Sequence, residues 1–209
     1  MQIIPAGWKP WIPFTIKDPM DTTIQEKLRH LSPQSCLSIV AETAPPDLQY
    51  ATLSDHKAPS DCQLKNVLLV HHTTLELPQA MIIHCPLLTS WLMFEQQQLQ
   101  PLARKHLGSE VEKLRLYSSF SCRNVYGRES GKRSQHANAA ALDIGGFTLT
   151  DGTQVSVLNH WSGNDAKSAF LKAVRDQACH YFGTVLGPEY NDAHHNHFHM
   201  DLSANNLCQ

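Results

Sequence analysis

The sequence of 209 residues has no long hydrophobic run and no strong excess of either charge. No stretch approaches the roughly 18 consecutive apolar residues of a membrane span, so we expect no transmembrane helix. Lys and Arg number 17, against 19 Asp and Glu. This balance argues against a polybasic surface for nucleic acid or anionic lipid. Internal repeats and low-complexity tracts are also absent.

No two cysteines form a C-x-x-C pair, which argues against a cysteine-based zinc site or a redox motif. An even number of cysteines at wide spacing favours disulfides and an oxidising compartment. The alternative is a set of reduced, buried thiols in a cytosolic protein. The cysteines stand at positions 36, 62, 85, 122, 179 and 208.

The first 15 residues, MQIIPAGWKPWIPFT, do not form a secretory signal peptide, because they lack an apolar run after a basic start. An oxidising compartment nevertheless requires export. We therefore expect that a signal or a membrane anchor, absent from this sequence, precedes Met1 in the full-length protein.

Hydrophobic residues make up 42% of the chain, enough for the core of one globular domain with or without an N-terminal extension. Prolines predict an extended lead-in over 1–19, and polar composition predicts a loop over 41–61. Apolar periodicity predicts helices over 21–31, 77–107 with a break or kink at Pro101, and 165–182, with Asp21 and Asp165 as caps. Strands are expected over 67–70, 111–120, 140–149, 153–158 and 196–202. This order predicts an α+β fold with a mostly antiparallel central sheet flanked by helices.

Histidines concentrate near the end of the chain, in the tract HHNHFHMD. In a strand over 196–202, side chains two residues apart point to the same face. His197, His199 and Asp201 would then share one face, while Phe198, Met200 and Leu202 would share an apolar face suited to the core. A face with three polar, metal-competent side chains is unusual unless it lines a site.

A second segment, SQHANAAALD, places His136 seven positions before Asp143. Zinc in a hydrolase takes three protein ligands with nitrogen or oxygen donors and keeps a fourth position open for water. If the two segments are neighbours in the sheet, a single ion can join them. We therefore predict a Zn²⁺ site with His136, Asp143 and His199 as its ligands.

Two further histidines remain for catalysis. His197 would stay unligated beside the attacking water and act as a general base. His194 lies on the preceding loop and would fold back over the same site. The alternative is an opportunistic surface site in which HHNHFH binds transition metals. That alternative does not account for Asp143 or for the apolar alternation of Phe198 and Met200.

The first segment resembles the S-x-H-x-x-G-x-A-x-D motif of the LAS zinc peptidases, which include D-Ala-D-Ala carboxypeptidases and murein endopeptidases. Ser134, His136, Ala141 and Asp143 match this motif, and Ala139 stands where glycine is usual. The histidine tract over 194–199 resembles the H-x-x-H-x-H ending of penicillin-insensitive murein endopeptidases.

More closely, residues from about 62 to 208 resemble the bacterial extensin-like C-terminal domain. The first 60 residues match much less well. We therefore expect an N-terminal extension with a short helix over 1–60 and a LAS-type zinc peptidase domain over 61–209. The matching stretches are SCRNVYGR, SQHANAAALDIGGFTLTDG, FLKAVRDQAC, FGTVLGPEYNDAHHNHFHMD and the late Cys208.

The resemblance implies a zinc-dependent peptidase that acts on peptidoglycan peptides in the periplasm. In LAS enzymes the first His, the Asp and the final His hold zinc and the penultimate His acts in catalysis, which agrees with the assignment above. The family also carries an Arg on a strand before the first motif, and Arg123 is in the corresponding place. It would grip a substrate carboxylate, with a structural ion pair as the alternative.

Other residues are expected to be structural. The resemblance implies that Cys122 and Cys179 are disulfide halves. Gly145 and Gly146 are expected at a bulge or a close contact beside the site. Trp161 either lines the cleft or is a buried aromatic, the more common outcome.

The resemblance favours hydrolysis of D,D- or L,D-cross-link peptides by an endopeptidase. A carboxypeptidase, a non-catalytic wall-binding module and a metal-storing protein are the alternatives. Related domains occur in L,D-endopeptidases associated with type VI secretion, so an envelope secretion machine is a candidate partner.

Overall fold

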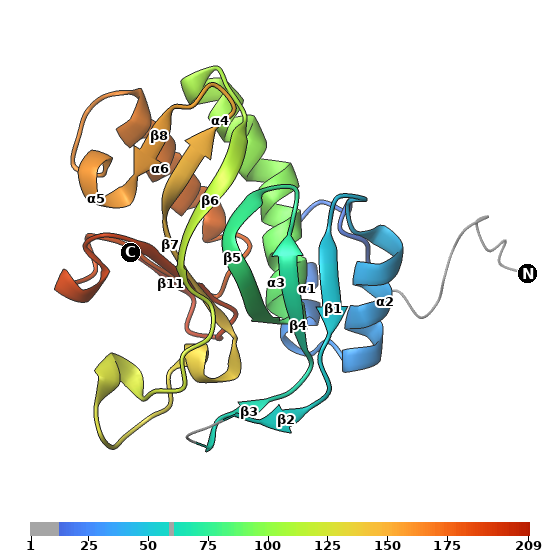
Figure 1. Ribbon diagram of the computed structural model, residues 1–209. Helices are drawn as coiled ribbons and strands as arrows, with labels where there is room; N and C mark the ends of the chain where they lie inside the picture. Colours follow the sequence, from blue (N-terminus) through green and yellow to red (C-terminus); the bar gives the residue numbers. More distant parts are fainter. Residues whose placement is uncertain (1–12, 59–60) are drawn as a thin grey trace, which may run out of the picture.

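A computed structural model of the protein describes residues 13–58 and 61–209, so most of the expected lead-in over 1–19 lies outside the described residues. Its centre is a nine-stranded sheet in the order β1-β4-β5-β6-β7-β10-β9-β11, with β8 beside β7 (Figure 1). The strands are β1 (Gln49–Thr52), β4 (Val67–His72), β5 (Glu76–His84), β6 (Val111–Ser118), β7 (Ala141–Leu149), β8 (Gln154–Ser156), β9 (Thr184–Leu186), β10 (Phe198–Asp201) and β11 (Leu207–Cys208). A separate hairpin pairs β2 (His56–Lys57) with β3 (Gln63–Leu64).

Helices cover one face of this sheet, and in Figure 1 α3, α4 and α6 lie on the same side of it. The helices are α1 (Thr22–Arg29), α2 (Pro33–Thr43), α3 (Cys85–Phe94), α4 (Gln100–Leu107), α5 (Val157–His160) and α6 (Ala166–Ala178). Short turns named η are η2 (Glu95–Leu99), η3 (Val125–Gly127), η4 (Gln135–Asn138) and η5 (Asp192–His194). The protein is therefore α+β, as expected.

The sheet is mixed, which corrects the expectation of a mostly antiparallel one. Strands β5 and β6 run parallel, as do β9 and β11, while the other pairs are antiparallel. A parallel pair needs a long crossover connection, usually helical. The helical segment from α3 to α4 is that crossover between β5 and β6.

The sequence did not predict this crossover, because the predicted helix over 77–107 is wrong in its first part. Residues 76–84 form β5, in which Leu77, Met81 and Ile83 are buried at odd positions. Helix α3 begins only at Cys85, with Pro86 in its first turn, where a missing N–H costs no hydrogen bond.

Pro101 does not end the helix. Before it, the helix widens into the π-turn η2, in which the Gln100 N–H donates to the Glu95 carbonyl five residues back. Such a turn accommodates a residue that has no N–H to donate, and the helix then continues as α4.

The capped helices agree with the sequence analysis. The Asp21 carboxylate accepts from the Ile24 N–H at 2.7 Å and begins α1, and the Asp165 carboxylate accepts from the Ser168 N–H at 2.9 Å and begins α6. Helix α6 ends at Ala178, four residues before the predicted end. The predicted loop over 41–61 is wrong, because it contains the end of α2 and the strands β1 and β2.

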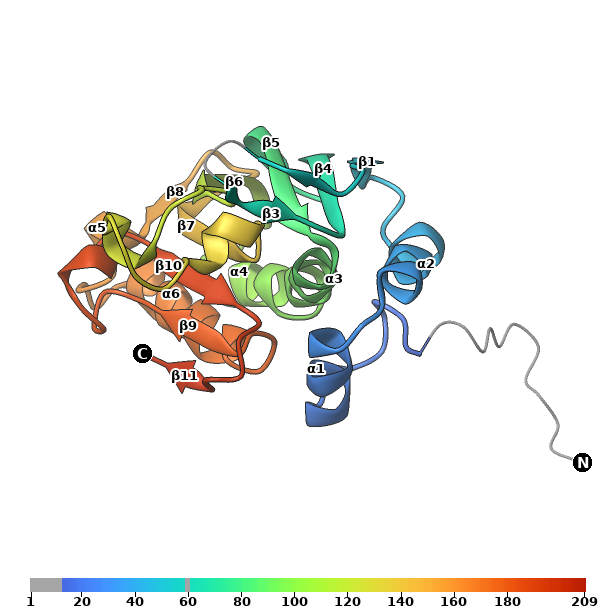
Figure 2. The same ribbon diagram turned by 90° about the horizontal axis from the view of Figure 1, so that it is seen from below.

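The segment before residue 60 packs against the main core. Helix α1 buries Ile24 and Leu28, and α2 buries Ile39 and Val40, in the same apolar cluster that contains the sheet residues. Figure 2, seen from below, shows α1 and α2 beside α3. The expected boundary near residue 60 stays a prediction.

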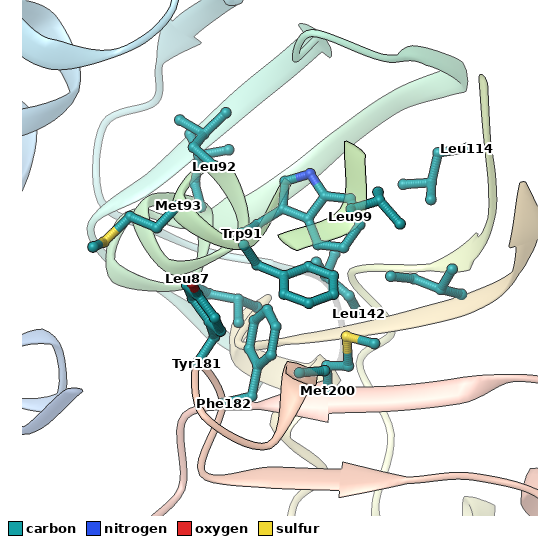
Figure 3. Close-up of a cluster of buried hydrophobic side chains, with 14 of the residues drawn as sticks. Leu87, Trp91, Leu92, Met93, Leu99, Leu114, Leu142, Tyr181, Phe182 and Met200 are labelled. Atoms are coloured by element: carbon teal, nitrogen blue, oxygen red, sulfur yellow. The ribbon is translucent and has the colours of Figure 1, made fainter. Parts of the chain in front are cut away.

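The core beneath the sheet is aromatic and tightly closed. Trp91, Phe94 and Phe182 are at most 2% exposed, and the Phe94 and Phe182 rings meet edge to face at 5.9 Å. Figure 3 shows Met200 of β10 and Leu142 of β7 reaching into this cluster. The apolar faces of β7 and β10 are thereby anchored, and their other faces point away from the core.

All six cysteines are paired, in the bridges Cys36–Cys85, Cys62–Cys122 and Cys179–Cys208. The expected disulfides, including Cys122 and Cys179 as halves, are confirmed. They indicate an oxidising, extracytoplasmic environment. Among residues 13–58 and 61–209, no helix has the length and apolarity to cross a membrane.

The Cys36–Cys85 bridge joins α2 to the first residue of α3 and spans 49 positions of sequence. Replacing both cysteines by alanine frees this loop in the unfolded chain, so we expect the free energy of unfolding to fall by about 4 kcal/mol. Urea unfolding of the oxidised wild type and the double variant measures the difference. An unchanged midpoint would contradict the inclusion of α2 in the cooperative unit.

Candidate metal centre

Strands β7 and β10 bring the two predicted segments together. They are antiparallel neighbours, and His199 stands directly opposite Asp143 in their register. Directly opposed residues of an antiparallel pair point to the same face. The residues that flank Asp143, Leu142 and Ile144, are fully buried on the other face.

The third predicted ligand arrives from the turn η4. Ser134 caps this turn, and its hydroxyl accepts from the His136 N–H at 3.3 Å. Ala139 closes the turn in the left-handed region at φ +55°, and its carbonyl accepts from the His84 N–H at 2.8 Å. This bond ties the turn to the end of β5 and holds His136 over the sheet.

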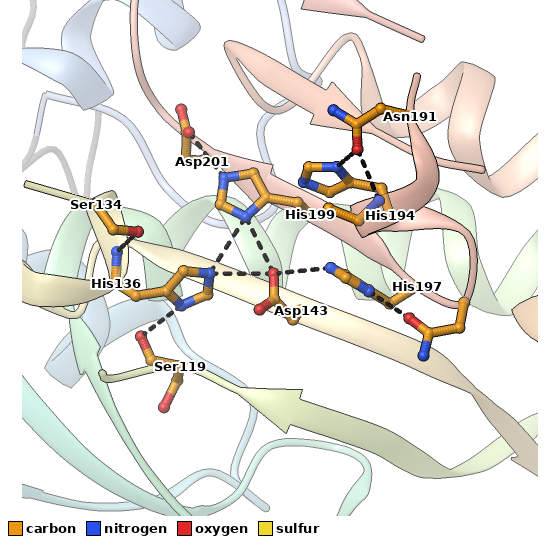
Figure 4. Close-up of polar contacts among 11 residues, drawn as sticks. Ser119, Ser134, His136, Asp143, Asn191, His194, His197, His199 and Asp201 are labelled. Atoms are coloured by element: carbon orange, nitrogen blue, oxygen red, sulfur yellow. Dashed lines mark hydrogen bonds and ion pairs between the residues drawn. The ribbon is translucent and has the colours of Figure 1, made fainter. Parts of the chain in front are cut away.

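The donor atoms of the three residues form a tight triangle (Figure 4). His136 Nε2 lies 3.1 Å from Asp143 Oδ1, His199 Nδ1 lies 3.0 Å from the same oxygen, and the two nitrogens are 3.2 Å apart. In a tetrahedral zinc site with bonds near 2.05 Å, the ligand atoms stand about 3.3 Å from one another. The spacing therefore suits a zinc ion with little rearrangement.

Hydrogen bonds behind the triangle set the tautomer of each imidazole. His136 Nδ1 donates to the Ser119 carbonyl at 3.3 Å, and His199 Nε2 donates to Asp201 at 3.1 Å. With a metal ion bound, both remaining nitrogens would be deprotonated and would point their lone pairs at it, which is the outer-shell arrangement typical of metal-binding histidines.

Sequence reasoning gave Asp201 and Ser119 no role. Asp201 was detectable, because it lies two residues after His199 and was placed on the same face. Ser119 contributes only its backbone carbonyl, for which the sequence carries no signal.

The centre stabilises positive charge. Burial alone would lower the pKa of His199, but hydrogen bonds to Asp143 and Asp201 raise it to about 9. Burial would raise the pKa of the Asp143 carboxyl, yet hydrogen bonds from His136 and His199 bring it well below its usual range. Two buried carboxylates thus require a cation between them, either a proton or a metal ion.

His197 and His194 lie beside the triangle and outside it. His197 Nε2 is 3.5 Å from Asp143 Oδ1, and its Nδ1 donates to the Asn196 side chain at 2.7 Å. His197 precedes β10, which begins at Phe198, so the turn before the strand places it rather than strand alternation. His194 belongs to η5, and its ring centroid is 5.3 Å from that of His197.

Both of these histidines are neutral near pH 7. Burial lowers the pKa of His197, and burial together with repulsion from His197 and His199 lowers the pKa of His194 to about 4. A neutral imidazole with one committed nitrogen keeps the other as a proton acceptor.

The triangle opens into a cavity of about 620 Å³, which Arg123, His194 and His197 also line. Arg123 lies in the loop after β6 and not on a strand. Its carbonyl accepts from the Ser134 N–H at 3.1 Å, which fixes it next to the η4 segment. Within the described ranges no ion pair involves Arg123, so the alternative of a structural ion pair finds no support.

The residues expected to be structural behave as such. Trp161 is 5% exposed and packs edge to face on Phe198 at 5.5 Å, so it is a buried aromatic. A side chain on Gly145 would collide with the Tyr117 ring, and one on Gly146 with the Val155 carbonyl. The expected close contacts beside the site are thus confirmed.

The comparisons with known proteins agree with the closer of the two resemblances. No curated protein and no solved structure matches the chain. A family model described as "Extensin-like protein C-terminus" matches residues 34–209, from α2 to the end of the chain. The match covers the whole candidate site and most of the chain, and the protein therefore belongs to the extensin-like C-terminus family.

Proposed function

We propose that this protein is a zinc-dependent peptidase that hydrolyses cross-link peptides of peptidoglycan in the periplasm, with a LAS-type fold. One observation carries the proposal: His136, Asp143 and His199 converge at ligand spacing, and two histidines outside the ligand set line the same open cavity. A structural metal site is closed by protein ligands, whereas a catalytic site keeps a position free.

The donor set favours zinc over other divalent ions. Two imidazole nitrogens and one carboxylate oxygen match catalytic zinc, whereas calcium and magnesium prefer oxygen ligands in larger numbers. The outer-shell bonds from His136 to Ser119 and from His199 to Asp201 add to this fit.

The chain's own residues supply the remaining steps. When bound, zinc would polarise the scissile carbonyl and lower the pKa of the attacking water. His197, neutral and with Nε2 facing the centre, accepts the proton of that water and returns it to the leaving amine. His194 offers Nε2 to the substrate as a hydrogen-bond acceptor, because its Nδ1 donates to Asn191 at 2.8 Å.

Charge on the cavity wall supports an anionic peptide as the substrate. Arg123, Lys132 and Arg133 line one side, whereas the two carboxylates that line the cavity, Asp143 and Asp201, belong to the centre itself. Peptidoglycan stem peptides carry several carboxylates. A planar guanidinium binds a carboxylate in bidentate fashion, and this supports Arg123 as the group that holds the substrate.

The reaction itself is tested with purified protein loaded with zinc. Incubation with cross-linked muropeptides, followed by mass spectrometry, is expected to yield uncross-linked products, and a chelator is expected to abolish them. Release of a terminal residue alone would indicate a carboxypeptidase. Binding to sacculi without any product would indicate a wall-binding module and would sink the enzymatic proposal.

The division of roles among the histidines predicts different defects in two variants. His199→Ala removes a ligand and is expected to lose bound zinc. His197→Ala is expected to keep zinc and to lose turnover about 10²–10⁴-fold, because a general base is removed. Metal content by mass spectrometry and turnover of muropeptides measure the two effects.

His195 provides the matched control, because it belongs to the same tract, is exposed and does not line the cavity. His195→Ala is expected to retain zinc and turnover. Equal loss of metal from the variants at 197 and 199 would contradict the assignment of ligand and base.

A third prediction concerns Arg123. Arg123→Lys keeps the charge and loses the planar fork, so we expect the KM for peptides with a free carboxylate to rise about tenfold or more. The same variant should not alter the KM for a substrate whose carboxylate is amidated. Arg115→Ala, an exposed arginine of β6, is the control. An equal effect on both substrates would argue against carboxylate binding.

A further inference from the structure

A chain of hydrogen bonds joins the cavity wall that carries Arg123 to the turn that carries His194. Tyr126, three residues after Arg123, extends its hydroxyl to Asn191, whose side-chain amide donates to Tyr126 Oη at 3.1 Å. The Asn191 carbonyl oxygen accepts from His194 Nδ1 at 2.8 Å and from the Ala193 N–H at 3.0 Å.

Tyr126 contributes little to the packing of the fold. It is 53% exposed, so most of its ring is not part of the core. Its backbone lies in the left-handed region, at φ 57° and ψ 21°, which is disfavoured for a residue with a large side chain. Strain of this kind is often retained at functional sites, and Tyr126 lines the same cavity as the metal centre.

Asn191 is the connecting group. Its side-chain oxygen accepts from the Ala193 N–H, which can only donate, so the oxygen faces Ala193 and His194 while the NH₂ faces Tyr126. With that orientation fixed, His194 carries its proton on Nδ1 and keeps Nε2 as an acceptor. If the tyrosine hydroxyl is removed, the NH₂ group loses its partner, and the Asn191 side chain holds the His194 ring less firmly.

We infer that Tyr126 is a positioning residue for the reaction: through Asn191 it holds His194 in one tautomer and orientation relative to the wall that binds the substrate carboxylate. A substrate carboxylate bound by Arg123 and the acceptor Nε2 of His194 thereby keep fixed positions relative to each other. The bound peptide would thus be held at two points. Its carboxylate would bind Arg123, and one of its hydrogen-bond donors would bind His194 Nε2. This inference rests on the proposed peptidase function.

The test compares Tyr126→Phe with Tyr50→Phe. Both variants delete one phenolic hydroxyl, but Tyr50 lies on β1, remote from the cavity. Tyr126→Phe is expected to lower kcat about fivefold to tenfold with little change in KM and with zinc content unchanged, because it affects a positioned group and not a ligand. Tyr50→Phe should keep wild-type kinetics.

Asn191→Ala is expected to lose at least as much kcat as Tyr126→Phe, and the double variant no more than Asn191→Ala alone, because both residues act through His194. Additive losses would overturn the connection. Wild-type kinetics in Tyr126→Phe would overturn the role of the tyrosine.

Nitrogen chemical shifts of the His194 ring give a readout that does not require turnover. In the wild type we expect the Nδ1–H tautomer, and in Tyr126→Phe a larger share of the Nε2–H tautomer, because Asn191 holds the Nδ1 proton less firmly. An unchanged tautomer in the variant would count against the inference even if activity fell. Failure of the wild type to cleave any muropeptide, with the tautomer shift still seen, would refute the peptidase and leave the hydrogen-bond chain standing.

Discussion

The candidate site depends on the register between β7 and β10. Asp143 and His199 face each other across this pair, and a slip of one residue would turn one of them into the core. The register is fixed from the opposite face, where Leu142 and Met200 are fully buried, as are Ile144 and Phe198. Burial of such side chains contributes about 1.5–3 kcal/mol each. Packing of the apolar core thereby keeps Asp143 and His199 side by side, although each would be better solvated in the unfolded chain.

The same constraint explains which parts of the site were predictable. Strand alternation in FHMD and ALDIG separates core residues from site residues, so the sequence was sufficient to place Asp143 and His199 on one face. His136 was added because it stands seven positions before Asp143 and zinc needs a third ligand, and the motif similarity agreed with this choice. The contacts of Ser119 and Asn191 could not be foreseen, because one acts through its backbone and the other through an amide on an irregular turn.

The largest error in the fold prediction has a physical reason of the same kind. Met81, Cys85, Leu88 and Leu92 fall at helical spacing, but Met81 belongs to β5 and the others to α3. Every residue of α3 is buried, so its sequence shows no polar face to mark where the helix begins. Hydrophobic periodicity marks the ends of an element best where that element has a face exposed to solvent. Because the strand β5 was missed, its parallel pairing with β6 was missed as well.

The loops that complete the site have little regular structure and are stabilised in another way. The Cys62–Cys122 bridge attaches the start of the Arg123 loop to the β2–β3 hairpin, and a small apolar cluster that includes Ala137 and Ala139 packs beneath η4. The Cys36–Cys85 bridge is attached to Cys85, the residue directly after His84. The His84 N–H donates to the Ala139 carbonyl at the end of η4. Because loops that bury little apolar surface contribute little to their own order, such covalent links limit the conformations open to His136 and Arg123. An oxidising compartment is therefore a condition for the geometry of the centre as well as for the stability of the fold.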